Sequence, residues 1–254
     1  MILYFSATGN SRYVAEQLAA ATGDIRLTDM RTISDGKLRF SISAGEPVGF
    51  VFPVHSWGMP KGLPELVSSL RFDGYSPESN YCYMACSCGD DAGLTFTQWM
   101  KCAGNAGLRG DAGYSVFMPN TYVLLPGFDT DDEATVTKKL QEAPLKIAEI
   151  AGMIARRERG DHTFHGSFSH FKSRIIYPAF MRMITDKPFH TDPEKCTGCG
   201  RCAAVCPTHN IVIADGRPQW QGNCINCLAC YHHCPTKSIG YGKKTRQKGQ
   251  YHFK

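Results

Sequence analysis

The sequence predicts two domains, an α/β domain built on a parallel sheet and a small cysteine-rich α+β domain. The first prediction rests on short apolar runs that alternate with helical patterns over residues 1–158. The second rests on two similar cysteine runs near the C-terminus. A chain of 254 residues is long enough for two cores. We place the domains at residues 1–159 and 187–254, joined by residues 160–186.

Five apolar runs of the α/β domain are expected to be strands. They cover residues 1–5, 25–30, 48–52, 81–85 and 114–118, with helical patterns between most of them. A last helical pattern begins at Glu133 and contains Pro144, which should kink the helix or begin a second one. This alternation is typical of a parallel sheet covered by helices.

A loop rich in hydroxyl groups joins the first strand to the first helix. Backbone N–H groups and hydroxyls at a helix N-terminus favour an anion, and Gly9 permits the turn. The chain has no Walker A lysine and no G-x-G-x-x-G after a strand, so the loop suits one terminal phosphate. Simple helix capping is the alternative. The loop residues are Ser6, Ala7, Thr8, Gly9, Asn10 and Ser11.

Two more loops follow the third and fourth strands. The carboxyl ends of parallel strands meet at one edge of the sheet, where a ligand crevice forms at the topological switch point. We therefore expect these loops to lie close to the hydroxyl-rich loop. They comprise Pro53, Val54, His55, Ser56, Trp57 and Gly58, and then Ser87, Cys88, Gly89 and Asp90.

With these loops the domain resembles the flavodoxins, whose first loop has the pattern S/T-x-T-G-x-T/S and many of which carry a C-G-D like that of Cys88 to Asp90. The resemblance implies a flavodoxin-like five-stranded parallel sheet of order 2-1-3-4-5 that binds FMN. The first loop would hold the phosphate and the other two the ring, with Trp57 against its face. His55 stands where flavodoxins usually carry tyrosine, so it could instead donate a hydrogen bond to reduced flavin.

The two cysteine runs share the pattern C-x-x-C-x-x-C-x-x-x-C-P and repeat after 28 residues. In this bacterial spacing three thiolates of one run hold one four-iron cluster and the fourth ligates the other cluster. Paired zinc sites and a disulfide framework are the alternatives. The predicted ligand sets are Cys196, Cys199, Cys202 and Cys234 for one [4Fe-4S] cluster, and Cys224, Cys227, Cys230 and Cys206 for the second.

Residues 190–240 resemble a two-cluster bacterial ferredoxin. Between the runs, Asp215-Gly216 lies between short apolar segments and predicts a hairpin with a tight turn. The order of the two domains resembles fused flavodoxin–ferredoxin proteins, called EFR1-type. The resemblance implies FMN and two [4Fe-4S] clusters, with the flavin converting between two-electron and one-electron transfer for redox partner proteins. The alternatives are a flavin-dependent reductase with a small substrate near His55, Trp57 and Tyr122, and an iron-sulfur redox sensor.

Charge is unevenly distributed along the chain, whose net charge is +5. Lysine and arginine outnumber acids by 10 to 3 from Lys187 onward, against 18 to 20 before it. The negative charge of bound clusters offsets much of this excess, so we expect no nucleic-acid partner. A basic tail remains, which is expected to be a solvated, frayed end or to dock an acidic redox partner. It contains Lys243, Lys244, Arg246, Lys248 and Lys254.

The remaining expectations concern location and the connecting segment. The sequence shows neither a signal-peptide pattern nor an apolar run of 18 residues, so we expect a cytoplasmic protein with reduced thiols and no membrane insertion. Residues 160–186 are too apolar and aromatic for a flexible spacer. They are expected to be packed, with a short helix interrupted near Pro178.

Overall fold

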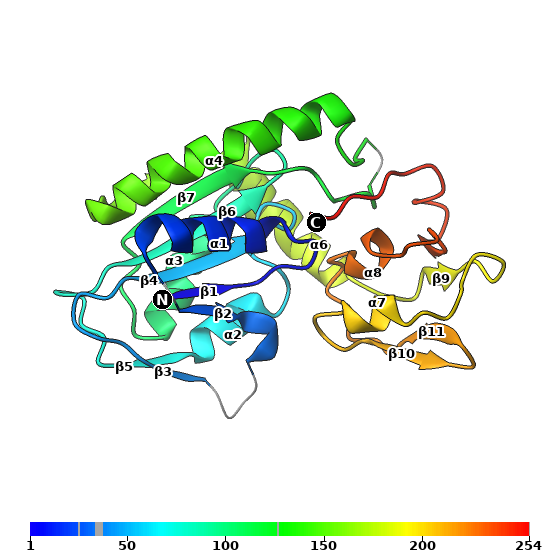
Figure 1. The fold of residues 1–254 in the computed structure, drawn as a ribbon, viewed down its shortest axis with the longest axis horizontal. Coiled ribbons are helices and arrows are strands. Elements are labelled where there is room, and N and C mark those ends of the chain that lie inside the picture. Colours follow the sequence, from blue (N-terminus) through cyan, green and yellow to red (C-terminus); the bar gives the residue numbers. More distant parts are fainter. Residues whose placement is uncertain (25, 34–37, 126, 254) are drawn as a thin grey trace.

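A computed structural model of the chain describes residues 1–24, 26–33, 38–125 and 127–253. A six-stranded parallel sheet with helices on both faces is followed by a helical connection and a small region of two-stranded sheets (Figure 1). Within the described ranges, no helix is long and apolar enough to cross a membrane.

The sheet has the strand order β2-β1-β4-β6-β7-β8, and every neighbouring pair is parallel. The first five strands give the expected order 2-1-3-4-5, so the flavodoxin-like fold class is confirmed. The second expected strand is shorter than predicted, and its residue 25 lies outside the described residues. The strands are β1 (Ile2–Tyr4), β2 (Leu27–Asp29), β4 (Val48–Pro53), β6 (Cys82–Cys88), β7 (Ala112–Phe117) and β8 (Gly160–His162).

Three strands were not predicted from the apolar pattern of the sequence, because they are short and mostly exposed. β8 adds a sixth strand beside β7, and its three residues are all exposed. A separate parallel pair is formed by β3 (Arg39–Ser41) and β5 (Arg71–Asp73), whose outer residues are exposed. β3 and β5 each have one half-buried apolar residue, Phe40 and Phe72, which packs against the core, and three residues are too few for a recognisable strand pattern.

Side chains of the central strands alternate between two helical layers, as the period of a strand requires. Phe50 and Phe52 of β4 pack toward α2 (Leu63–Ser69) and α3 (Thr95–Asn105). Val51 packs on the other face, toward α1 (Asn10–Thr22) and α4 (Glu133–Ala155). A short 3-10 turn, Met30–Thr32, follows β2.

Helix α4 runs without interruption from Glu133 to Ala155, with Pro144 inside it (Figure 1). The expected second helix is therefore absent from this described stretch. Pro144 lies on the exposed face, where water can take the place of the hydrogen bond that proline cannot donate. The core-facing side of the helix keeps its apolar residues, among them Ile147, Ile150 and Ile154.

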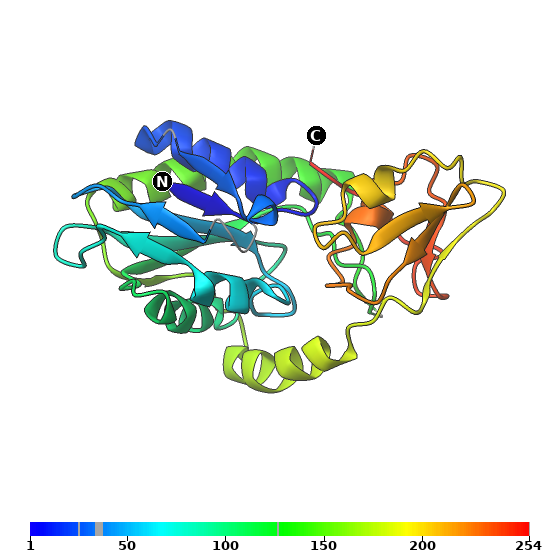
Figure 2. The ribbon, with the colours of Figure 1, turned by 90° about the horizontal axis from the view of Figure 1, so that it is seen from below.

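The connection after β8 is one continuous helical segment made of α5 (Ser169–Phe171), a π-helical stretch (Lys172–Ile176) and α6 (Tyr177–Met183). Figure 2 shows it running along one side of the molecule between the sheet and the C-terminal region. The interruption expected near Pro178 is wrong. Proline sits in the first turn of α6, and the wider turn before it bonds the Tyr177 N–H to the Lys172 carbonyl.

Packing of this connection is one-sided. Ser173 and Phe180 are buried, whereas a row of large apolar side chains is more than half exposed. The expectation of a packed segment is wrong for these residues. Phe171, Ile175 and Met183 lie on the helical segment, and a single helix lying against a domain can bury only one of its faces. Phe164 and Phe168 belong to the stretch before the helix and are exposed as well.

The C-terminal region has two antiparallel pairs and two short helices. The hairpin is β10 (Ile211–Ala214) with β11 (Arg217–Trp220), and both turn residues, Asp215 and Gly216, have positive φ as a tight hairpin turn requires. This prediction is confirmed. The second pair is β9 (Phe189–Thr191) with β12 (Ile239–Tyr241), and the helices are α7 (Arg201–Ala204) and α8 (Ala229–His232).

The segment after β12 is not a frayed end over its described residues. Tyr231 Oη donates to the carbonyls of Lys248 and Gly249 at 2.9 and 3.1 Å, one proton being shared, and Lys248 pairs with Asp129. The Phe253 N–H donates to the Thr8 carbonyl at 2.8 Å, which brings this segment beside the start of α1 (Figure 1). That expectation is therefore wrong here; Lys254 lies outside the described residues.

The packing of β4 against β6 gives a test of the core. A Cβ added at Gly49 would lie 2.5 Å from the Tyr83 ring, whereas one at Gly104 of α3 meets nothing within 4 Å. Gly49→Ala should therefore lower the free energy of unfolding by about 1–3 kcal/mol through overpacking. Urea unfolding measures the difference, and Gly104→Ala is the control, expected to be neutral or stabilising. Equal midpoints for the two variants would contradict this account of the core.

Candidate functional site

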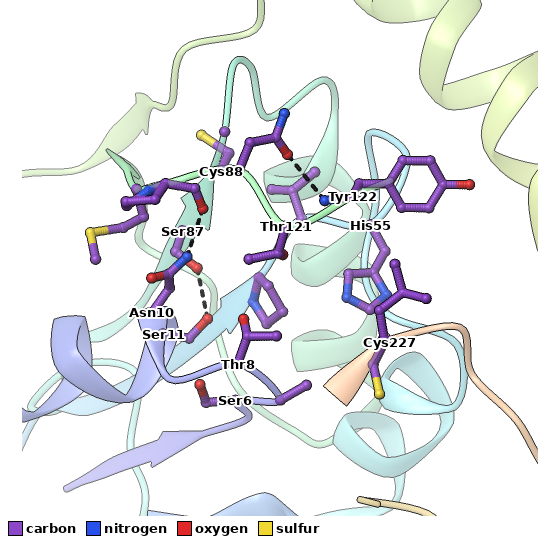
Figure 3. A pocket seen from close by; sticks show the side chains of 18 of the residues that line it. Ser6, Thr8, Asn10, Ser11, His55, Ser87, Cys88, Thr121, Tyr122 and Cys227 are labelled. Atoms are coloured by element: carbon purple, nitrogen blue, oxygen red, sulfur yellow. Dashed lines mark hydrogen bonds between the residues drawn. The ribbon is translucent and has the colours of Figure 1, made fainter. Parts of the chain in front are cut away.

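A cavity lies at the carboxyl ends of β1, β4, β6 and β7 (Figure 3). All three predicted loops contribute to it, although they lie far apart in the sequence. The fold brings them together because parallel strands end at the same edge. The predicted residues that line it are Ser6, Ala7, Thr8, Asn10, Ser11, Pro53, Val54, His55, Ser56, Ser87, Cys88 and Gly89.

Four predicted residues do not line this cavity. Trp57 and Asp90 line an adjoining cavity that shares Val54, Cys88 and Gly89 with the first. Gly58 lies against the Tyr177 ring, and a Cβ there would be 2.4 Å from it. Gly9 has φ of 98° and lies against Phe253, where a Cβ would meet Phe253 at 2.8 Å.

The hydroxyl-rich loop presents polar atoms that lack protein partners. Asn10 Nδ2 donates to the Pro119 carbonyl at 2.8 Å, yet its Oδ1 is buried and, within the described residues, has no hydrogen-bond partner. The Thr8 hydroxyl also makes no hydrogen bond among those residues. Buried polar groups are normally satisfied, so the unpaired Asn10 Oδ1 points to a polar ligand, and the Thr8 hydroxyl lines the same cavity. They fit the phosphate and the hydroxylated side chain of FMN.

Other groups of this loop hold one another. Ser11 and Ser87 share a hydrogen bond of 2.7 Å between their hydroxyls, which ties the first loop to the third. Ser6 Oγ accepts from the Gly9 N–H at 3.2 Å. Asn10 and Ser11 open α1, and their N–H groups have no acceptor within the helix. These hydrogen bonds hold the loop in place, and Asn10 and Ser11 line the cavity.

The second loop has an unusual backbone and is held by the connecting helix. Ser56 and Trp57 both have positive φ, 50° and 66°, which is strained for residues other than glycine and is frequent at ligand sites. The Ser173 hydroxyl donates to the Trp57 carbonyl at 2.8 Å, and Lys172 Nζ lies 5.0 Å from the Trp57 ring centre. Since that face of the indole carries a cation, only the other face is available to a ring.

Burial keeps the titratable side chains of the cavity neutral. It lowers the pKa of His55 to about 4, so the imidazole is uncharged at neutral pH. A hydrogen bond with Cys86 and burial raise the pKa of Cys88 well above the ordinary thiol value. Neutral His55 can donate or accept one hydrogen bond, and Cys88 behaves as a small apolar residue.

Several lining residues were not predicted to lie here. The residues after β7 could have been predicted, because they too lie at the carboxyl end of a parallel strand, like the other two strand-end loops. The others come from the connecting helix and from the second cysteine run, where nothing in the sequence signals a cavity. The unpredicted residues are Met118, Pro119, Asn120, Thr121, Tyr122, Phe180, Asn226, Cys227 and Leu228.

The eight cysteines of the two runs are free thiols that gather in two groups. Cys196, Cys199, Cys202 and Cys234 line one cavity. Burial raises the pKa of Cys230, and the nearby thiols of Cys227, Cys224 and Cys206 add to the effect. In each group, the fourth thiol of one run lies beside three thiols of the other.

Backbone N–H groups point at three of these sulfurs. Asn210 donates to Cys206, Asn226 to Cys224 and Ser238 to Cys234, each at 3.3 Å. Such donors stabilise a charged thiolate. Among the described residues, no three His, Cys, Asp or Glu side chains converge around a point that would suit a single metal ion. A four-iron cluster needs wider ligand spacing, because each thiolate binds a different iron.

Comparison with known sequences identifies the C-terminal region. Residues 189–239 match the family of 4Fe-4S dicluster domains. An uncharacterized ferredoxin of Methanocaldococcus jannaschii is 40% identical over 53 residues, which cover 19% of this chain and 69% of the relative.

Comparison with solved structures concerns the N-terminal region. A flavodoxin from the domain Archaea covers 61% of this chain and 97% of its own, with 16% identity and a TM-score of 0.36. A putative flavoprotein from Bacteroides uniformis covers 56% and 96%, with 14% identity and a TM-score of 0.33. The fold assignment of this region rests on the strand order and pairing described above.

Proposed function

The chain belongs to the ferredoxins with a 4Fe-4S dicluster domain, fused here to a flavodoxin-like domain, and on this premise we propose that it couples FMN to two [4Fe-4S] clusters. FMN exchanges electrons in pairs with one partner and singly with a cluster. The protein would then convert between two-electron and one-electron transfer for redox partner proteins.

One observation carries this proposal: a single cavity joins the hydroxyl-rich loop to the second cysteine run. Thr8 and Asn10 lie on one wall, and Asn226, Cys227 and Leu228 on another. Further contacts hold the two regions together, since His232 Nε2 lies 2.6 Å from the Thr121 carbonyl and His233 Nε2 lies 3.3 Å from the Ala7 carbonyl. Because a predicted cluster ligand lines the candidate flavin cavity, electron transfer within the chain is favoured over a mobile ferredoxin domain that delivers electrons elsewhere.

In the proposed complex the hydroxyl-rich loop binds the phosphate through neutral donors. Two arginines that lie beside this loop are already paired, Arg12 with Glu16 at 2.7 Å and Arg31 with Asp29 at 2.6 Å. Asn10 Oδ1 would accept from a hydroxyl of the flavin side chain, and neutral His55 would hydrogen-bond at the ring. The adjoining cavity would place the ring beside Trp57.

The ligand sets follow the two groups of thiols. Cys196, Cys199, Cys202 and Cys234 would hold one cluster, and Cys224, Cys227, Cys230 and Cys206 the other. The first four cysteines line one cavity, and the other four thiols lie close to one another, which supports this assignment. The crossed fourth ligands would lock the two halves of the repeat together.

Electron counting tests the proposed function. Anaerobically purified holoprotein should contain one FMN and about eight irons, and should accept about four electrons, two at the flavin and one at each cluster. A reductive titration followed by absorbance gives the number. Uptake that stops at the two electrons of the flavin, with full iron content, would contradict the proposal.

The phosphate site is tested by removing one hydroxyl. Thr8→Val keeps the shape of the side chain and deletes a hydrogen bond to a charged group worth roughly 1.5–3 kcal/mol. FMN affinity should therefore fall by at least about tenfold in a binding titration. Thr22→Val, at the far end of α1, is the control and should bind FMN normally. Unchanged affinity for Thr8→Val would mean that the hydroxyl does not contact the phosphate.

The crossed ligands are tested with a reciprocal pair of variants. Cys234→Ala should disrupt the cluster of the first run and expose Cys196, Cys199 and Cys202 to alkylation. Cys206→Ala should expose Cys224, Cys227 and Cys230 instead. Iodoacetamide labelling and mass spectrometry identify the freed thiols. If each substitution freed the thiols of its own run, the crossed assignment would be wrong.

A further inference from the structure

We infer an order of the two clusters relative to the flavin, which rests on the proposed function. The cluster ligated by Cys227 is the inner centre, which exchanges electrons with FMN. The cluster ligated by Cys199 is the outer centre, which exchanges them with the partner protein. Each step moves one electron: the flavin is oxidised as the inner cluster is reduced, and the inner cluster is reoxidised as the outer one is reduced.

The position of Cys227 is the first argument. Of the eight cysteines in the two runs, all within the described residues, Cys227 alone lines the flavin cavity (Figure 3). Its counterpart in the repeat, Cys199, is exposed to solvent. An iron bound to Cys227 would therefore lie close to the flavin cavity, while an iron bound to Cys199 would lie close to solvent.

The residue after the first cysteine of each run gives the second argument. Ile225 is 7% exposed and belongs to the apolar core that also contains Phe52 and Met59, and Cys227 packs against the same core. The counterpart of Ile225 is Thr197, which is exposed. The second run is thus anchored in the α/β region, whereas the first run makes no such insertion.

Backbone conformation gives the third argument. In the first run, positions of positive φ are occupied by Gly198 and Gly200, at 71° and 73°. The second run has the same backbone at Asn226 and Leu228, at 54° and 60°. A leucine there is strained where glycine is not. Leu228 is 2% exposed and packs in one cluster with Val123 and Leu124, so its side chain offsets the strain by fixing the loop beside the cavity.

The direction of transfer between clusters follows from what surrounds the sulfurs. Cys234, a ligand of the outer cluster, lies 3.2 Å from the Ser238 hydroxyl in addition to the Ser238 N–H. The inner cluster has two donors as well, the Asn210 N–H at Cys206 and the Asn226 N–H at Cys224, so these donors do not distinguish the two clusters. Solvent does, because Cys199 of the outer cluster is exposed and water stabilises the more negative, reduced cluster. The outer cluster should therefore have the higher potential and draw electrons outward.

Removal of each cluster tests the order. Cys224→Ala with Cys230→Ala deletes the inner cluster, and Cys196→Ala with Cys199→Ala deletes the outer one, leaving about four irons in each variant. Flash reduction of FMN in the anaerobic holoprotein should bleach a cluster at a rate independent of protein concentration in wild type and in the outer deletion. The inner deletion should lose this phase. Loss in the outer deletion, with retention in the inner one, would overturn the order.

A milder pair of variants keeps all eight ligands. Ile225→Thr with Leu228→Gly gives the second run the residues of the first, and Thr197→Ile is the matched control. With iron content unchanged, the first variant should slow the flavin-to-cluster phase and weaken the magnetic broadening of the flavin radical signal by the reduced cluster. The control should match wild type. Wild-type rates and broadening in the first variant would contradict the anchoring argument.

The same experiment separates failure of the order from failure of the proposed function. If flash-reduced FMN in wild type bleaches no cluster, the chain does not couple its cofactors and the proposed function itself is wrong. If wild type transfers electrons and only the outer deletion blocks transfer, the function stands and the proposed order fails.

Discussion

The insertion of Ile225 into the core of the α/β region is the contact on which the arrangement of the molecule depends. It fixes the second cysteine run against the sheet edge where three loops already converge. The contact is apolar and buried, so salt should weaken it little. Hydrogen bonds from His232 and His233 to backbone carbonyls add direction to it, since they require one orientation of α8.

In the proposed complex the candidate flavin site would stabilise the phosphate without a charged side chain in contact with it. The arginines beside the loop are neutralised by their own acidic partners, and His55 is uncharged. Fixed amide dipoles and hydroxyls serve this purpose at helix N-termini, and partial enclosure of the cavity makes each of them more effective. A neutral, enclosed surrounding also raises the energetic cost of adding negative charge to the flavin. The reduced flavin should therefore release its electrons more readily.

Much of this arrangement could be predicted from sequence because it depends on local patterns. Runs such as Val48 to Phe52 and the cysteine spacing are contiguous, and the edge at which loops meet follows from parallel strands. The contribution of Cys227 to the flavin cavity depends instead on how two regions pack, which no local pattern encodes. The exposed side of the connecting segment could not be predicted for a related reason. Phe168 and Phe171 are residue types typical of a core, and only the structure shows that they are exposed.

The contact between Phe253 and the hydroxyl-rich loop links two stretches separated by nearly the whole described chain. Phe253 donates its N–H to the Thr8 carbonyl, packs on the Tyr13 ring with centroids 4.5 Å apart, and covers Gly9. A ribosome makes Thr8 before either cysteine run, and it makes Phe253 only after both of them. The loop cannot reach its final form until then, so biosynthesis itself sets a sequence in which iron ligands are available before the flavin cradle is complete.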